Sequence, residues 1–393
     1  MSLTGLVAVL PSCARRCLTV AIADSTCAAT TIAAADADCL CGNTALNKQA
    51  TVCITTHCTV RESLFTKNLT LAACGVPART NHAATPVCIT FLLLCVVFVG
   101  LRFWARIKTS LPWKVWWDDV IHLISLLGTA AFTAIVVAMQ YHGFGTDLWT
   151  IPFDAIYTCF QALYALFALY IFSRDLVRLS ILLFYLRIFQ YRTVARALIL
   201  ATFAMVVCNG VAFSCVVFFA CRPVDGFWTG WDGEHPARCV SNNLLFWAGA
   251  VIVTFIDIWI IVIPLLFVAR LKLGLRNKVL ASAMFAFGLI VVVISGYRMG
   301  HINEFTNSTN PTYDGVTLII WSGLELYSGI ICACMPTAHI LLKPLLARVG
   351  CLGRPLATPQ APRPDKTPST SGRVHGGDED EMELTPRRIL TEA

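Results

Sequence analysis

The stretch that decides the fold is "VIHLISLLGTAAFTAIVVAMQ", residues 120–140. It contains no Asp, Glu, Lys or Arg, and a helix needs about 20 mostly apolar residues to cross the hydrocarbon core of a bilayer. A helix also satisfies its own backbone hydrogen bonds, which lipid cannot do. We therefore predict that this stretch is a transmembrane helix.

The composition of the whole chain agrees with a membrane protein. Its 393 residues are 57% hydrophobic and only 13% charged, whereas a soluble globular chain carries about 25% charged residues. The net charge of +7 does not indicate a nucleic-acid partner, because the basic residues fall at helix ends, where membrane topology explains them. We predict an all-α polytopic protein whose first partner is the lipid bilayer.

Hydropathy divides the chain into three parts. Residues 11–80 are rich in cysteine, residues 85–345 hold the long apolar runs, and residues 346–393 are polar. The last part is rich in Pro, Ser, Thr and charge, so we predict a disordered tail. The predicted spans are residues 86–104, 120–140, 160–186, 195–220, 244–267, 279–297 and 316–342.

Lysine and arginine residues are concentrated in alternate loops. Loops predicted to be on one side, and the start of the tail, hold Arg102, Arg106, Lys108, Lys114, Arg187, Arg192, Arg196, Arg270, Lys272, Arg276, Lys278, Lys343, Arg348 and Arg354. The facing loops are poor in positive charge, and residues 141–159 have none. The positive-inside rule therefore predicts a cytoplasmic C-terminus and an extracellular N-terminus at the plasma membrane.

Two sequons fall on the predicted outer side. They are Asn68-Leu69-Thr70 and Asn307-Ser308-Thr309, so Asn68 and Asn307 are predicted glycosylation sites. Residues 1–13 have no basic segment and only a short apolar run. We expect either that the first span carries the N-terminal part across the membrane or that the true start lies elsewhere.

Cysteine is concentrated near the N-terminus. Of 18 cysteines, eight lie before residue 75: Cys13, Cys17, Cys27, Cys39, Cys41, Cys53, Cys58 and Cys74. Such a density is typical of a small domain stapled by disulfides in an oxidising compartment. Zinc is the weaker alternative, because the segment has one histidine and no paired Cys-x-x-Cys. The residues themselves leave the pairing open.

Several motifs resemble known families. The segments "LPSCARRC" (10–17) and "DADCLC" (36–41), with Cys27, Cys53, Cys58 and Cys74, resemble the CFEM domain of fungal extracellular membrane proteins. The later part is similar to the seven-helix fungal rhodopsin-like domain. Its motifs are "WWDD" (116–119), "YHGFGTDLW" (141–149), "RLSILLFYLRIF" (178–189), "CRPV" (221–224), "DIWIIVIP" (257–264) and "WSGLELYSGIICACMPT" (321–337).

The resemblance, which covers residues 11–345, implies a seven-helix bundle behind a disulfide-stapled helical CFEM domain. It implies the pairs Cys13–Cys58, Cys17–Cys53, Cys27–Cys39 and Cys41–Cys74. It also implies haem as a candidate cofactor. Asp36, three residues before Cys39, matches the axial iron ligand of soluble CFEM proteins. The alternative is that Asp36 caps a helix or ends a turn, which is a common role of Asp.

Charged residues inside the predicted spans are costly and usually face the bundle interior. Arg178, Asp257 and Glu325 are the candidates for an intramembrane polar network, with Arg174 and Asp175 nearby. A ligand-gated or proton-coupled network and a purely structural pairing are both open. Retinal is not expected, because residues 316–342 contain no lysine for a Schiff base.

On the outer side, Cys221 and Cys239 flank a Trp-rich loop and are predicted to form a bridge, with Cys159 as the competing partner. No nucleophile–base pair or phosphate-binding loop stands out, so we do not expect an enzyme. The resemblance implies a receptor-like protein that senses an extracellular or host cue, with a heterotrimeric G protein as a candidate partner. A receptor that signals without a G protein fits the sequence equally well. The alternatives are a haem- or iron-handling membrane protein that captures haem with its CFEM domain, and a transporter.

Overall fold

The protein is described by a computed structural model that covers residues 8–27, 37–108, 116–240, 242–268 and 275–348. The predicted tail from residue 349 onward and the candidate haem ligand Asp36 lie outside the described residues. Within the described ranges the chain is almost entirely helical, which confirms the all-α prediction.

The N-terminal part consists of short helices joined by disulfides. The helices are α2 (Ser12–Ala23), α3 (Ala37–Gly42), α4 (Thr44–His57) and α5 (Val60–Ala73). The Asn43 side chain caps α4, and Thr59 with Glu62 forms a capping box on α5. Their apolar faces bury a small cluster that includes Leu18, Ile22 and Leu46. A domain of this size is usually too small to be held together by burial alone.

Four disulfides supplement this small core. They are Cys13–Cys58, Cys17–Cys53, Cys27–Cys39 and Cys41–Cys74, the same pairs that the resemblance implies. A disulfide typically contributes about 2–4 kcal/mol by restricting the unfolded chain. The disulfides therefore contribute substantially to the stability of the N-terminal part.

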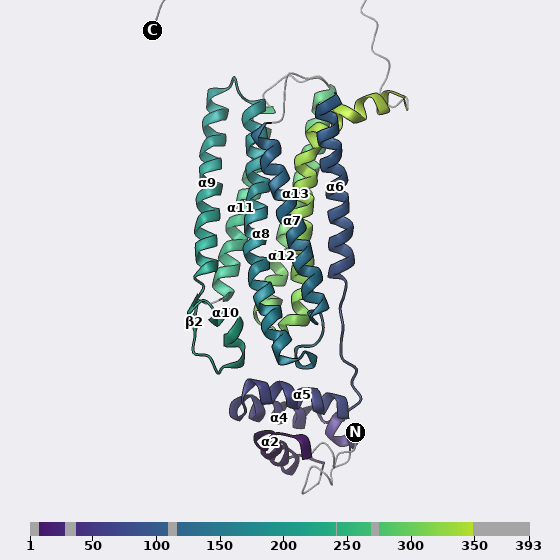
Figure 1. The fold of residues 1–393 in the computed structure, drawn as a ribbon, viewed down its shortest axis with the longest axis vertical. Coiled ribbons are helices and arrows are strands. Elements are labelled where there is room, and N and C mark those ends of the chain that lie inside the picture. Colours follow the sequence, from purple (N-terminus) through teal and green to yellow (C-terminus); the bar gives the residue numbers. More distant parts are fainter. Residues whose placement is uncertain (1–7, 28–36, 109–115, 241, 269–274, 349–393) are drawn as a thin grey trace, which may run out of the picture. The chain divides into compact units, whose positions relative to one another are not determined.

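Seven long helices in the described ranges are apolar enough to cross a membrane. They run side by side as a bundle (Figure 1). Their full bounds are α6 (Ala84–Lys108), α7 (Trp117–Tyr141), α8 (Phe153–Ile188), α9 (Thr193–Phe218), α11 (Asn242–Val268), α12 (Leu275–Thr306) and α13 (Pro311–Arg348). The chain is therefore a multi-pass membrane protein.

Two boundaries differ from the sequence prediction for a physical reason. Helix α12 continues to Thr306 rather than ending near Tyr297, because Arg298 is buried in an ion pair and so is tolerated within the helix. Arg106 lies beyond the predicted end of the first span at residue 104, but the structure places it with Arg102 in the last turns of α6, where both pair with acids of α7. Hydropathy ends a span at such charges, whereas the paired helix continues.

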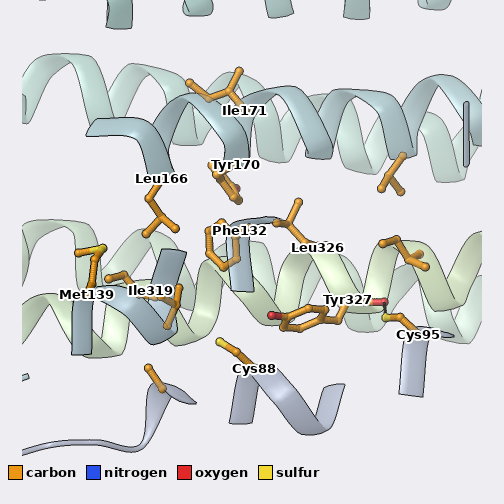
Figure 2. Packing of buried hydrophobic residues seen from close by; sticks show 14 of the residues in the cluster. Cys88, Cys95, Phe132, Met139, Leu166, Tyr170, Ile171, Ile319, Leu326 and Tyr327 are labelled. Atoms are coloured by element: carbon orange, nitrogen blue, oxygen red, sulfur yellow. Dashed lines mark hydrogen bonds between the residues drawn. The ribbon is translucent and has the colours of Figure 1, made fainter. Parts of the chain in front are cut away.

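The main core lies among α6, α7, α8 and α13. Figure 2 shows Phe132, Leu166 and Tyr327 packed between these helices. The Tyr327 ring stacks on Phe91, and its hydroxyl lies 2.7 Å from the Thr133 Oγ1. Because α13 is the most buried of the spanning helices, side chains at its centre can contact several neighbours at once.

One end of the bundle carries small ordered loops. Here lie η2 (Leu148–Thr150), β1 (Cys221–Arg222), α10 (Gly226–Thr229), η3 (Gly230–Asp232) and β2 (Arg238–Cys239). Strands β1 and β2 pair antiparallel, and Cys221 and Cys239 form a disulfide. Cys159, the competing partner, is a buried free thiol.

The "YHGFGTDLW" motif forms a tight turn at the same end. Gly143 and Gly145 both have φ of +99°, which L-residues with a side chain rarely adopt. A Cβ on Gly145 would lie 2.3 Å from the Asn81 carbonyl oxygen. Asp147 in this motif accepts hydrogen bonds from Arg79 and Asn310. The motif therefore joins the approach to α6 with the start of α13.

Candidate functional site: a buried ion network in the helix bundle

Arg178 of α8 is the centre of the site. Its Nε and Nη2 donate to the two carboxylate oxygens of Asp257 on α11, both at 2.8 Å. Its Nη1 donates to Asp175 Oδ1 at 3.1 Å, and its Nη2 lies 3.8 Å from Glu325 Oε1. The side chain of Arg178 is only 5% exposed. A two-point guanidinium–carboxylate pair is the strongest ionic contact that side chains make.

Glu325 of α13 links Arg178 to a second arginine. Its Oε2 accepts a hydrogen bond from the Tyr170 hydroxyl at 2.7 Å and lies 3.0 Å from Arg298 Nε of α12. Ser295, one turn before Arg298, donates to Asp257 at 3.4 Å. The network therefore joins α8, α11, α12 and α13.

Arg174 and Asp175 extend the network along α8. Arg174 donates through Nε and Nη2 to Asp175 Oδ1, both at 3.3 Å. The other oxygen of Asp175 faces Gly210 of α9, where a Cβ would lie only 2.5 Å away. A glycine at position 210 is therefore what lets the buried carboxylate lie against α9.

The charges of this network balance. Three guanidiniums face three carboxylates, and all six side chains are buried. Moving an isolated charge into such an interior is costly, so each group depends on the others for compensation. An arrangement of this kind can fix the positions of four helices relative to one another. Those positions can change if one charged side chain is separated from its partner.

The structure brings together Arg178, Asp257 and Glu325, the three residues selected from the sequence. Sequence reasoning missed Arg298 and Tyr170. Arg298 directly follows the end of the predicted sixth span. A single arginine next to the end of a predicted span is a signal that could have added Arg298 to the candidate network residues. Tyr170 gives no signal in the sequence, because a tyrosine in an apolar helix is usually a core residue.

A second ionic cluster lies at the opposite end of the bundle from the Cys221–Cys239 disulfide. Asp118, fully buried at the start of α7, accepts hydrogen bonds from Arg102 and Arg106 of α6, each at 2.8 Å. Asp119 accepts one from Arg102 Nε at 3.0 Å and also pairs with Arg106. Arg187 of α8 approaches Asp118 to 3.5 Å. Carboxylates in a first helical turn are also favoured by the helix dipole.

This cluster explains the "WWDD" motif. Arg102 also donates to the carbonyl oxygen of Ala333 on α13, so the cluster joins α6, α7, α8 and α13. Three arginines face two aspartates, which leaves one excess positive charge.

Polar contacts also connect α5 with the ordered loops. Arg61 donates to the Tyr157 hydroxyl at 2.7 Å and to Asp232 Oδ2 at 3.2 Å. Tyr157 also donates to Asp232. Burial of the Asp232 carboxyl would by itself raise its pKa, but the hydrogen bonds from Tyr157, the Glu234 amide, His235 and Arg61 outweigh burial and lower the pKa. Asp232 therefore stays ionised in mildly acidic surroundings.

The two candidate glycosylation sites have different surroundings. Asn307 is exposed just after α12, and its side chain bonds to Asn303. Asn68 is half-buried on α5 and lines a hollow with Trp149 and Lys67, whose ammonium lies 3.7 Å from the Trp149 ring centroid. Glycosylation of both residues stays a prediction.

The fold and the buried network define a class: a seven-helix membrane protein with a disulfide-stapled N-terminal domain. Two family models agree with that description. The fungal rhodopsin domain matches residues 101–344, and the CFEM domain matches residues 6–75. The chain belongs to the fungal rhodopsin domain family and carries a CFEM domain.

Three relatives are similar over more than half of the chain. "Receptor GIN3" of Arthrobotrys oligospora is 28% identical over 294 residues, which cover 73% of this chain and 69% of the relative. "Polyenoic acids biosynthesis gene cluster protein Ba17b" of Metarhizium anisopliae is 27% identical, covering 70% and 76%. A "SAT4 family membrane protein" of Emericella nidulans is 26% identical, covering 60% and 56%. No solved structure matches the chain.

Proposed function

We propose that the protein is a receptor at the plasma membrane that binds an extracellular ligand and transmits a signal into the cell without catalysing a reaction. The observation that carries the proposal is the buried, charge-balanced network around Arg178, which joins four spanning helices. A ligand that perturbs one charged residue of the network changes the charge compensation of all the others. The similarity to a protein named "Receptor GIN3" supports the same function.

The proposed orientation has the N-terminus outside and the C-terminus in the cytoplasm. Among the described residues, four disulfides lie in the N-terminal part and the fifth joins Cys221 to Cys239, and disulfides persist in oxidising compartments. The Asp118–Asp119 cluster would then lie at the cytoplasmic end, where a heterotrimeric G protein is the proposed partner.

The proposal is tested with the full chain in nanodiscs and a purified heterotrimeric G protein. We expect the protein to accelerate exchange of GDP for a fluorescent GTP analogue severalfold over empty nanodiscs. We also expect Asp118→Asn to accelerate it further, because that change loosens the cytoplasmic cluster. If neither protein accelerates exchange, G-protein coupling is wrong. Saturable solute uptake into proteoliposomes would indicate a transporter instead.

Haem binding by the N-terminal part is a separate proposal. It rests on the position of Asp36, three residues before Cys39 in the sequence. A carboxylate is a hard ligand that suits ferric iron. We expect haemin added to the full-length protein to give a Soret band that Asp36→Ala abolishes and that Asp38→Ala leaves intact. An unchanged band in the Asp36 variant would contradict the proposed ligand.

A further inference from the structure

A cavity lies beside the Arg178 network, in the half of the bundle nearer the Cys221–Cys239 loop. It has a volume of about 70 Å³ and is bounded by side chains of α8, α9, α11, α12 and α13. A cavity volume of about 10–15 Å³ is enough for one water molecule. This cavity therefore has room for a small polar group and several carbon atoms. Ligand sites in helix bundles commonly lie between the helices.

Two arginines form the polar part of the cavity wall. Arg174 and Arg298 both line it, and they are 6% and 7% exposed. Their guanidinium carbons lie 5.2 and 5.1 Å from the centroid of the Tyr170 ring, so both cations contact this ring. The carboxylates that balance them, Asp175 and Glu325, are not among the lining residues. The cavity therefore faces positive charge.

The hydrogen-bonding capacity of these arginines is incompletely used. Arg298 lies within 3.0 Å of Glu325, but its buried Nε makes no hydrogen bond to any described residue. The hydrogen bonds of Arg174 to described residues are two long contacts of 3.3 Å to Asp175. By contrast, Arg178 makes two 2.8 Å bonds to Asp257 and does not line the cavity. The arginines whose N–H donors are incompletely used are therefore the two that line the cavity.

Apart from the hydroxyl-bearing side chains of Tyr170 and Ser322, the rest of the wall is apolar. Eight lining side chains are hydrocarbon: Phe167, Ile171, Phe213, Val217, Ala250, Val253, Ile302 and Leu318. A ligand that fits needs an anionic group for the arginines and a hydrocarbon body for this wall. A carboxylate matches a guanidinium with two parallel hydrogen bonds. From this arrangement we propose that the cavity is a binding site for a small apolar carboxylate.

The proposal deepens the receptor function and rests on it for its biological meaning. A bound carboxylate competes with Glu325 for Arg298 and with Asp175 for Arg174. Competition for Arg298 weakens the pairing with Glu325 that joins α12 to α13, and competition for Arg174 frees Asp175 within α8. The ligand would thereby act on the charge-balanced network itself.

The test uses the full chain in nanodiscs and three probes of matched chemistry. Hexanoate has both charge and chain, 1-hexanol keeps the chain without the charge, and acetate keeps the charge with almost no chain. Binding is measured by isothermal titration calorimetry with empty nanodiscs subtracted. We expect saturable binding of hexanoate, with affinities for both comparators at least about tenfold weaker, because each lacks one of the two contacts.

Variants assign the binding to this cavity. We expect Arg298→Gln and Arg174→Gln each to weaken hexanoate binding about tenfold or more. Ala250→Val should also weaken it by occupying the cavity without changing charge. Arg196→Gln removes an exposed arginine at the start of α9 and should leave binding within twofold. The double variant Arg298→Gln with Glu325→Gln keeps the charge balance if the single variant fails to fold.

Absence of saturable hexanoate binding in the wild-type protein would overturn the proposal, and so would binding that survives Arg298→Gln. Equal affinity for hexanoate and 1-hexanol would show that the cavity binds only hydrocarbon. Failure of the receptor proposal can be distinguished from failure of the binding-site proposal, because the first is measured by nucleotide exchange and the second by hexanoate binding. If hexanoate binds but does not change nucleotide exchange, the proposed binding site is supported and its proposed role in signalling is wrong.

Discussion

Replacing Asp257 by asparagine is expected to destabilise the protein by about 3–5 kcal/mol, the usual cost of removing one partner from a buried ion pair. Asparagine has nearly the same shape, so the loss is that of charge. Arg178 would lose its two-point partner at 2.8 Å, and three buried arginines would face two carboxylates. The measurement is thermal unfolding of the detergent-purified protein, together with the amount that reaches the cell surface.

Matched variants separate charge balance from other effects. Asp225→Asn makes the same chemical change at an exposed position and should leave unfolding unchanged. The double change Arg178→Met with Asp257→Leu replaces the pair by apolar side chains and should recover much of the stability. If the double variant also signals like the wild type, the Arg178–Asp257 pair is purely structural. Wild-type stability of Asp257→Asn would contradict the buried pairing itself.

Asp118→Asn is expected to have a comparably large effect at the other end of the bundle. Asp118 is fully buried and faces Arg102, Arg106 and Arg187, from two helices. Its neutralisation leaves Asp119 as the single carboxylate against three arginines. We expect a loss of about 2–5 kcal/mol and faster hydrogen exchange in the last turns of α6 and α8, measured by mass spectrometry.

The two adjacent aspartates provide an internal comparison. Asp119 contacts two arginines, Arg102 and Arg106, whereas Asp118 contacts those and Arg187. We therefore expect Asp119→Asn to be less destabilising and to leave exchange in α8 closer to wild type. Asp154→Asn, at an exposed position near the start of α8, is the control for loss of one carboxylate. An effect of Asp119→Asn equal to that of Asp118→Asn would mean that the closer approach of Arg187 to Asp118 contributes nothing.

The architecture could be predicted from the sequence because a membrane span depends on the hydrophobicity of consecutive residues. Uncharged runs such as residues 120–140 give a strong signal, and the seven spanning helices are confirmed. The family prediction is also confirmed. Helix ends were less accurate, as for α12, because burial of Arg298 depends on Glu325, which is distant in sequence. A hydropathy window contains no information about such a partner.

The candidate site was only partly readable. Intramembrane charge is rare enough to select Arg178, Asp257 and Glu325 from the sequence, since an uncompensated charge in the bilayer is so costly. The sequence could not say that Arg178 binds Asp257 at two points, that Tyr170 donates to Glu325, or that Gly210 makes room for Asp175. Those facts depend on how four helices meet.

By itself, then, the sequence determined the number of spans, the cysteine-rich N-terminal part and the residues whose charge demands partners. Each of these follows from composition along the chain. The tertiary structure alone decided which arginine pairs with which carboxylate, and that Arg174 and Arg298 face a cavity while their counter-ions lie outside its wall. The physical reason is that pairing and cavity shape depend on the distances between helices, which the order of residues within each helix does not fix.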